Sequence, residues 1–186
     1  MKWLLYILGG IAGLLVACVL VLLALGRRTD ADRMQASVII HRPADQIWPY
    51  LYEGDKLKTW VTWLKDVQRD PGPPQTGRTQ VWTMEDMNNG GMLMKINSTV
   101  DAAEPNRRLA VNLSVPDAFR GHAEYRLIDL GGGATKVESD SRYEFTNPFA
   151  KLMTPLIIPS AQKKATSDLD RLRAAVENAP VAEAVK

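Results

Sequence analysis

The run TKVESDSRYEF, residues 135–145, alternates between charged side chains and side chains that are apolar, aromatic or hydroxylic. Because successive side chains of a strand point to opposite faces, this run predicts a strand with one charged face. Its charged members are Lys136, Glu138, Asp140, Arg142 and Glu144. An antiparallel sheet with water on that face needs another element to cover its other face. The run therefore limits the possible folds more than any other feature of the chain.

Several other runs would complete such a sheet. Residues 34–41 are rich in β-branched side chains, and alternation recurs in residues 78–86, 92–100, 108–115 and 122–130. The sequences typical of loops and turns between these runs are DPGPPQTG (70–77), NNGG (88–91) and GGG (131–133). We predict about six or seven antiparallel strands from this pattern.

Helical signals lie on either side of the strands. Pro43 opens a short helix, and residues 55–64 place apolar side chains on one stripe of a second. Asn147 is a favourable N-cap for a long C-terminal helix, which we expect Pro155 and Pro159 to interrupt. Strands bounded by helices predict an α+β fold in which the last helix covers the sheet.

The N-terminal run from Trp3 to Leu25 has 23 residues and no charge. At about 1.5 Å per residue, a helix of this length crosses a bilayer. A cleaved signal peptide and a lipoprotein signal ending at Cys18 are the alternatives. Signal peptides have shorter apolar regions, and the apolar run continues well past Cys18. We therefore expect an uncleaved transmembrane anchor at residues 1–26.

The predicted organisation is an anchor, a linker at residues 27–33, a folded domain at 34–178 and a flexible tail at 179–186. We expect a single-pass protein of the bacterial inner membrane. Basic residues flank both ends of the anchor, so the side of the membrane that holds the domain stays open.

Composition argues against several classes of function. The formal net charge is +2 and no run of Lys and Arg forms a basic stripe, so nucleic acid is not an expected partner. The chain has one cysteine and two histidines, His41 and His122, too few soft ligands for us to expect a metal site. We expect no cofactor, and the sequence contains no recognisable catalytic constellation.

The order of elements and several phrases resemble the START-like superfamily, also called SRPBCC or the birch-pollen-allergen fold. The resemblance covers residues 34–178 and is closest to the polyketide cyclase/dehydrase and lipid transport branch. The phrases that carry it are SVIIHRPADQIWPYL, TWVTWLKDV, Gly77-Arg78, EPNRRLAVNL, YRLIDLGGGATKVESDSRYEF and LDRLRAAVE. The resemblance implies a helix-grip, in which a curved antiparallel sheet wraps round the C-terminal helix and encloses a cavity. Members of the superfamily bind lipids or sterols, catalyse cyclisation or dehydration, or serve as interaction modules.

Polar residues on the predicted inner face suggest a cavity rather than a solid core. Hydroxyl groups that are buried without a partner cost about 1–3 kcal/mol each, so an inward row of them favours water or ligand nearby. The candidate cavity residues are Trp60, Trp63, Trp82, Met92, Met94, Tyr125, Ser139, Ser141 and Tyr143. Satisfied hydroxyls in a solid core remain the alternative. We expect Trp48 to pack the first helix onto the sheet, and Trp60 or Trp63 to close the cavity.

The functional prediction is a membrane-anchored binder or carrier of a hydrophobic, lipid-like molecule. A cyclase or dehydrase would need acid/base groups in the cavity, for which Tyr125, Tyr143, His122 and Asp101 are the candidates. A non-catalytic interaction module is the third possibility. The apolar segment LMTPLIIP, residues 152–159, is either core packing or a membrane-facing gate.

Overall fold

The computed structural model describes residues 2–26, 30–69, 72–86 and 90–180, and it confirms the predicted α+β fold. The elements are α1 (Lys2–Gly26), β1 (Arg33–Ile40), α2 (Ala44–Ile47), the 3-10 helix η1 (Trp48–Leu51), α3 (Gly54–Trp60), β2 (Leu64–Arg69), β3 (Thr79–Asp86), β4 (Met92–Glu104), β5 (Arg108–Val115), β6 (Phe119–Gly131), β7 (Ala134–Phe145) and α4 (Pro148–Glu177). Parts of the predicted linker, of the 70–77 loop, of the 88–91 turn and of the tail lie outside the described residues.

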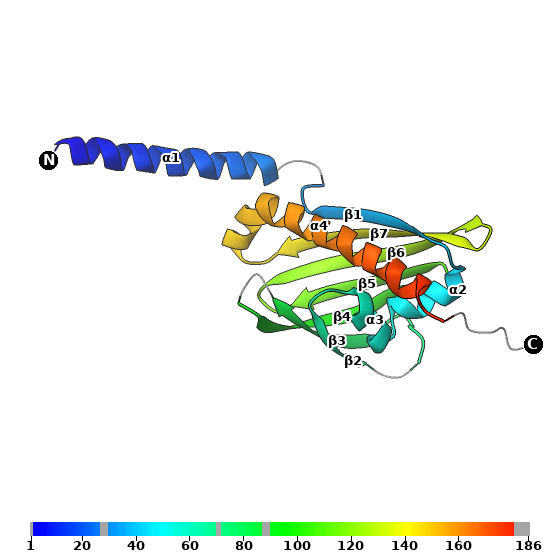
Figure 1. Cartoon of the computed structure of the whole chain (residues 1–186). Helices are drawn as coiled ribbons and strands as arrows, with labels where there is room; N and C mark the ends of the chain where they lie inside the picture. Colours follow the sequence, from blue (N-terminus) through cyan, green and yellow to red (C-terminus); the bar gives the residue numbers. More distant parts are fainter. Residues whose placement is uncertain (1, 27–29, 70–71, 87–89, 181–186) are drawn as a thin grey trace, which may run out of the picture.

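All seven strands form one antiparallel sheet in the order β1-β7-β6-β5-β4-β3-β2. The sheet curves round α4, which runs across its inner face (Figure 1). Leu169, Leu172 and Val176 of α4 are buried in one core with the apolar residues of this face, among them Val137 of β7. The alternation in residues 135–145 therefore separates a charged outer face from a covered inner face.

The first strand leads into short helical turns that close one end of the sheet. Pro43 precedes α2 as its N-cap residue, and Pro49 lies in the first turn of η1. Trp48 is buried in the main core, where its ring centroid lies 6.0 Å from that of Tyr52. Proline at the start of a helical turn removes no hydrogen bond, which explains why these short elements tolerate it.

Strand β2 was not expected from the sequence. The predicted helical stripe over residues 55–64 is wrong beyond Trp60, because Val61 has an extended backbone and Trp63 has a φ of 73°. Leu64 then starts a strand that pairs with β3. Leu64 is buried in this strand just as it would have been on the helical stripe, so the apolar pattern alone could not separate the two.

Helix α4 is continuous through Pro155 and Pro159, and the prediction that these prolines interrupt it is wrong. Asn147 caps its first turn by accepting hydrogen bonds from the backbone N–H groups of Phe149 and Ala150, at 2.9 and 3.3 Å. The helix is held on one side by β1 and on another by the end of α1. These tertiary contacts outweigh the loss of two backbone hydrogen bonds.

Helix α1 includes a segment, Tyr6–Gly26, that is long and apolar enough to cross a membrane, with a mean hydropathy of 2.8. Its side chains are exposed along most of its length, while Leu22 and Leu25 in the last turns are half-buried. A Cβ built on Gly26 would lie 3.8 Å from Cγ of Pro155, so the end of α1 touches α4. Figure 1 shows the rest of α1 extending away from the domain.

Candidate ligand cavity

A cavity of about 600 Å³ lies between α4 and the inner face of the sheet. The apolar residues that line it come from the strands, from the loop after α3 and from α4. They are Met34, Val61, Met84, Ile96, Val111, Leu113, Phe119, Ala123, Phe145, Ile157, Ile158, Ala161, Ala165 and Leu169. The lining reaches the surface at Glu85, Phe145 and Ser160, none of which is buried. The last turns of α4, which carry Leu172 and Val176, fill the core, and the cavity lies under the middle of the helix, from Ile157 to Leu169.

Eight of the nine residues predicted for a cavity lie along this one. They are Trp60, Trp63, Trp82, Met94, Tyr125, Ser139, Ser141 and Tyr143. Met92 does not line it: its side chain is 62% exposed at the start of β4, where it pairs with the last residue of β3. Alternation places Met92 and Met94 on the same side of the strand, but it does not show where along the strand the cavity ends.

One wall of the cavity carries the hydroxyl groups of Ser139, Ser141, Tyr125 and Tyr143. Burial raises the pKa of Tyr143 to about 12. Burial also raises the pKa of Tyr125, and a hydrogen bond with Ser139 acts weakly in the opposite direction. Within the described part of the chain, the Tyr143 hydroxyl has no hydrogen-bond partner. Both phenols are therefore neutral at physiological pH, and that of Tyr143 is free to bond a guest molecule.

The ring of Tyr143 lies directly against the backbone of β6. Its partner in the register is Gly121, and a Cβ built on Gly121 would lie 2.7 Å from Cδ1 of the Tyr143 ring. Glycine therefore allows the ring to approach the neighbouring strand closely, and the ring also packs against Phe119 at 5.7 Å between ring centroids. This close approach fixes the position of the hydroxyl in the cavity wall.

The opposite wall contains a charged pair that sequence reasoning missed. Lys164 and Asp168 line the cavity one turn apart on α4, and Asp168 is buried. Asp168 Oδ1 also accepts hydrogen bonds from the backbone N–H and the hydroxyl of Thr62, at 3.1 and 2.6 Å. Their spacing of four residues shows that they share one face of the helix, next to the apolar positions 165 and 169, but exposed ion pairs have the same spacing.

This pair holds the loop that carries Trp63. The ammonium group of Lys164 lies 5.2 Å from the centre of the Trp63 ring, a cation–π distance. Trp63 has a φ of 73°, which is uncommon for a bulky residue and costs about 1–3 kcal/mol. The contacts of Thr62 and Trp63 with α4 offset this strain and keep Trp63 at the cavity.

Trp60, in contrast, is a core residue at the cavity wall. It is 3% exposed, and its indole N–H donates to the carbonyl of Tyr50 at 2.8 Å. Its ring meets Tyr125 edge to face, with 6.1 Å between centroids. Trp63, rather than Trp60, is therefore the tryptophan on the loop that borders the cavity.

Two of the four acid/base candidates from the sequence lie away from the cavity. His122 is hydrogen-bonded through Nδ1 to the side-chain oxygen of Asn112 at 2.9 Å, and Asn112 also donates to Asp101. These side chains lie on the outer face of the sheet, and none lines the cavity. In residues 2–26, 30–69, 72–86 and 90–180, no three His, Cys, Asp or Glu side chains are grouped as a metal site requires.

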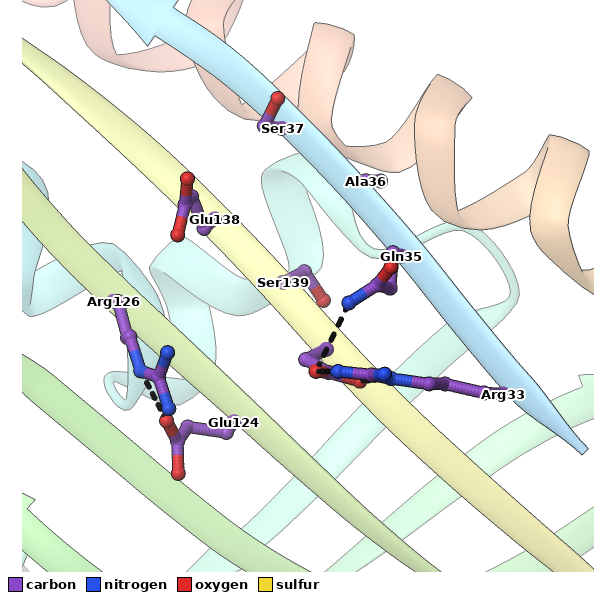
Figure 2. A pocket seen from close by; sticks show the side chains of 9 residues that line it. Arg33, Gln35, Ala36, Ser37, Glu124, Arg126, Glu138 and Ser139 are labelled. Carbon is purple, nitrogen blue, oxygen red and sulfur yellow. Dashed lines mark hydrogen bonds and ion pairs between the residues drawn. The ribbon is translucent and has the colours of Figure 1, made fainter. Parts of the chain in front are cut away.

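A second hollow, of about 320 Å³, lies on the charged outer face over β1, β7 and β6. Figure 2 shows Arg33 and Gln35 on β1 and Arg126 beside Glu124 on β6. Arg33 donates to Asp140 at 2.8 Å, and Arg108 donates to Glu124 at 2.7 Å. These hydrogen bonds hold the pKa of both carboxyl groups below the ordinary value. Because these carboxylates are already paired with arginines, this hollow offers little unpaired charge for a ligand to bind.

Comparisons with known proteins agree with this architecture. A sequence model described as "Polyketide cyclase / dehydrase and lipid transport" matches residues 31–177. Curated proteins yield no match. A solved structure from Thermus thermophilus has a TM-score of 0.63 at 18% identity, covering 77% of this chain and 96% of that one. One from Chromobacterium violaceum has a TM-score of 0.63 at 13% identity, covering 80% and 99%. The Zhui aromatase/cyclase of a Streptomyces species has a TM-score of 0.63 at 14% identity, covering 78% and 93%. At these identities the structures share the fold alone.

Proposed function

The chain belongs to the polyketide cyclase/dehydrase and lipid transport family, and from that premise we propose that it is a membrane-anchored protein that binds or carries a hydrophobic, lipid-like molecule. The cavity between α4 and the sheet is the proposed binding site. The proposal includes α1 as the membrane anchor, for which its length and apolar composition are the support.

The observation that carries the proposal is the chemistry of the cavity wall. Small-molecule sites are mostly apolar hollows of about 300–1,000 Å³ with a few polar groups that orient the ligand. The cavity here has about 600 Å³ and mainly apolar walls. The Tyr143 hydroxyl, neutral and without a partner among the described residues, offers one hydrogen bond to a guest. The preferred ligand is therefore a mainly apolar molecule that carries a hydrogen-bonding group.

A cyclase or dehydrase acting on an apolar substrate is the alternative. The similar fold of the Zhui aromatase/cyclase and the charged pair inside the cavity favour it. General acid/base catalysis needs a group that is free to accept or donate a proton at the substrate. Both oxygens of Asp168 are already engaged, by Thr62 and by Lys164. Burial raises the pKa of both Tyr125 and Tyr143, so neither phenol serves as a base and each is a weak acid, and binding has more support than catalysis.

Native mass spectrometry of the full chain, released from membranes in mild detergent, tests the proposal. We expect a co-purified apolar molecule. Replacing Ser139 and Ser141 together by leucine should abolish its uptake, because leucine side chains would occupy the polar wall. Ser37→Leu is the matched control, since Ser37 is on the outer face of β1. A ligand-free chain that takes up nothing from a lipid mixture would contradict the proposal and favour the interaction module.

A further inference from the structure

The strand register places one end of the sheet beside α1. Strand β1 starts at Arg33, after α1, and Arg33 pairs with Arg142 near the end of β7. Phe145 pairs with Phe119, and Phe119 with Val115, so the β5–β6 turn lies at the same end. The start of β4 and the end of β3 follow on the next strands. Helix α4 also begins there, directly after β7.

Four large apolar side chains are exposed at this end. Met92 and Leu93 on β4 are 62% and 68% exposed, and Phe149 and Leu156 on α4 are 70% and 56% exposed. We call these four residues the apolar rim. The surface part of the cavity lining, including Phe145 and Ser160, belongs to the β7 end and the first half of α4. The cavity therefore opens at the end of the domain that carries the apolar rim.

Helix α1 identifies what covers the rim. Its half-buried Leu22 and Leu25 and its contact with Pro155 place the last turns of α1 against the first half of α4. With a rise of about 1.5 Å per residue, Leu22 lies about 6 Å from the end of α1. Apolar side chains of interfacial elements reach about 5–10 Å into a bilayer. A bilayer crossed by α1 would therefore meet the start of α4 at this depth.

We propose that the apolar rim docks into the bilayer around α1, so that the cavity opens directly onto the acyl chains. An apolar ligand would then pass between membrane and cavity without crossing water. The route of exchange rests on the proposed ligand binding, whereas the docking rests only on the anchoring by α1 that the proposed function includes.

Site-directed labelling of the full chain in phosphatidylcholine vesicles tests the docking. In a Cys18→Ser background, an environment-sensitive fluorophore is attached to Leu93→Cys, to Phe149→Cys and, as a control, to Leu130→Cys. Leu130 is 50% exposed near the β6–β7 turn, at the opposite end of the sheet. We expect blue-shifted emission and quenching by brominated lipid at the first two positions and not at Leu130. Equal, water-like emission at all three positions would overturn the docking.

Self-association and loss of the anchor are distinguished from docking by two further measurements. A blue shift that disappears when each lipid nanodisc holds one copy of the chain would mean that a second copy covers the rim, and would overturn the proposal. Release of the chain by alkaline carbonate would show that α1 does not anchor it, and would overturn the docking as well.

The route of exchange is tested by transfer of a fluorescent fatty acid from vesicles to the cavity. Transfer should slow in Phe149→Asp, with equilibrium binding unchanged. Labels in lipid without any fatty-acid binding would support the docking and contradict only the ligand-binding part of the proposed function. Fatty-acid binding with all labels in water would support the proposed ligand binding and contradict the docking.

Discussion

Replacing Gly121 by alanine tests whether the position of Tyr143 shapes the cavity. The added Cβ would lie 2.7 and 2.8 Å from two carbons of the Tyr143 ring, and 3.2 Å from the carbonyl oxygen of Arg142. Carbon atoms in ordinary contact are about 3.5–4.0 Å apart. The ring must therefore move by about 1 Å. It would move into the cavity, which is the free space next to this pair of strands. We expect the free energy of unfolding to fall by about 1–3 kcal/mol, which is typical of overpacking.

A double-mutant cycle separates this clash from other effects of the substitution. In a Tyr143→Ala background the ring is absent, so Gly121→Ala should cost little, or stabilise the strand by about 0.5–1 kcal/mol through its lower backbone entropy. The assay is urea unfolding of the full chain in detergent, followed by tryptophan fluorescence. In parallel, Gly121→Ala should weaken binding of a fluorescent fatty acid because the displaced ring enters the cavity. An equal loss of stability in both backgrounds would refute the reasoning.

Three other substitutions address separate parts of the structure. Asn147→Ala removes the acceptor for two backbone N–H groups at the start of α4 and should lower the unfolding free energy by about 1 kcal/mol, measured by the same urea titration. Asp168→Ala leaves Lys164 without its partner beside an apolar cavity and should lower the unfolding free energy by about 3 kcal/mol. A loss of less than about 1 kcal/mol, as for an exposed ion pair, would show that the pair does not stabilise the fold. Arg108 lowers the pKa of Glu124 from its ordinary 4.5, so the stability from this pair is present above pH 4.5 and is lost as pH falls through the lower folded pKa. Thermal unfolding of Glu124→Gln should therefore depend less on pH below 4.5 than that of the parent chain.

Much of the sheet could be predicted because alternation is a direct consequence of strand geometry. Residues 135–145 alternate without a break, and the structure shows them as β7 with its charged side outward. Strand β2 could not be predicted in this way. Trp60 and Leu64 are four residues apart and both buried, which fits a helix as well as a helix followed by a strand. The left-handed backbone at Trp63 that separates them has no local sequence signal such as glycine.

The composition of the cavity could be predicted better than its extent. Inward hydroxyl groups on β7 indicated a polar wall, and Ser139, Ser141 and Tyr143 do lie along the cavity. Met92 fulfils the same alternation but lies beyond the cavity, a distinction that depends on where α4 crosses the sheet. The role of Asp168 also needed tertiary structure, because its partner Thr62 is 106 residues away in the sequence.

The two prolines inside α4 give its halves different resistance to local opening. Proline has no amide hydrogen, so the carbonyl groups of Lys151 and Pro155 lack the donor that would normally come from four residues further on. The half of α4 after Ala165 retains its backbone hydrogen bonds and holds Leu169 and Leu172 in the core. Opening the first half therefore breaks fewer bonds and exposes less apolar surface than opening the second. We therefore expect the part of α4 before Ala165, which contributes Ile157, Ile158 and Ala161 to the cavity wall, to open locally more readily than the part after it.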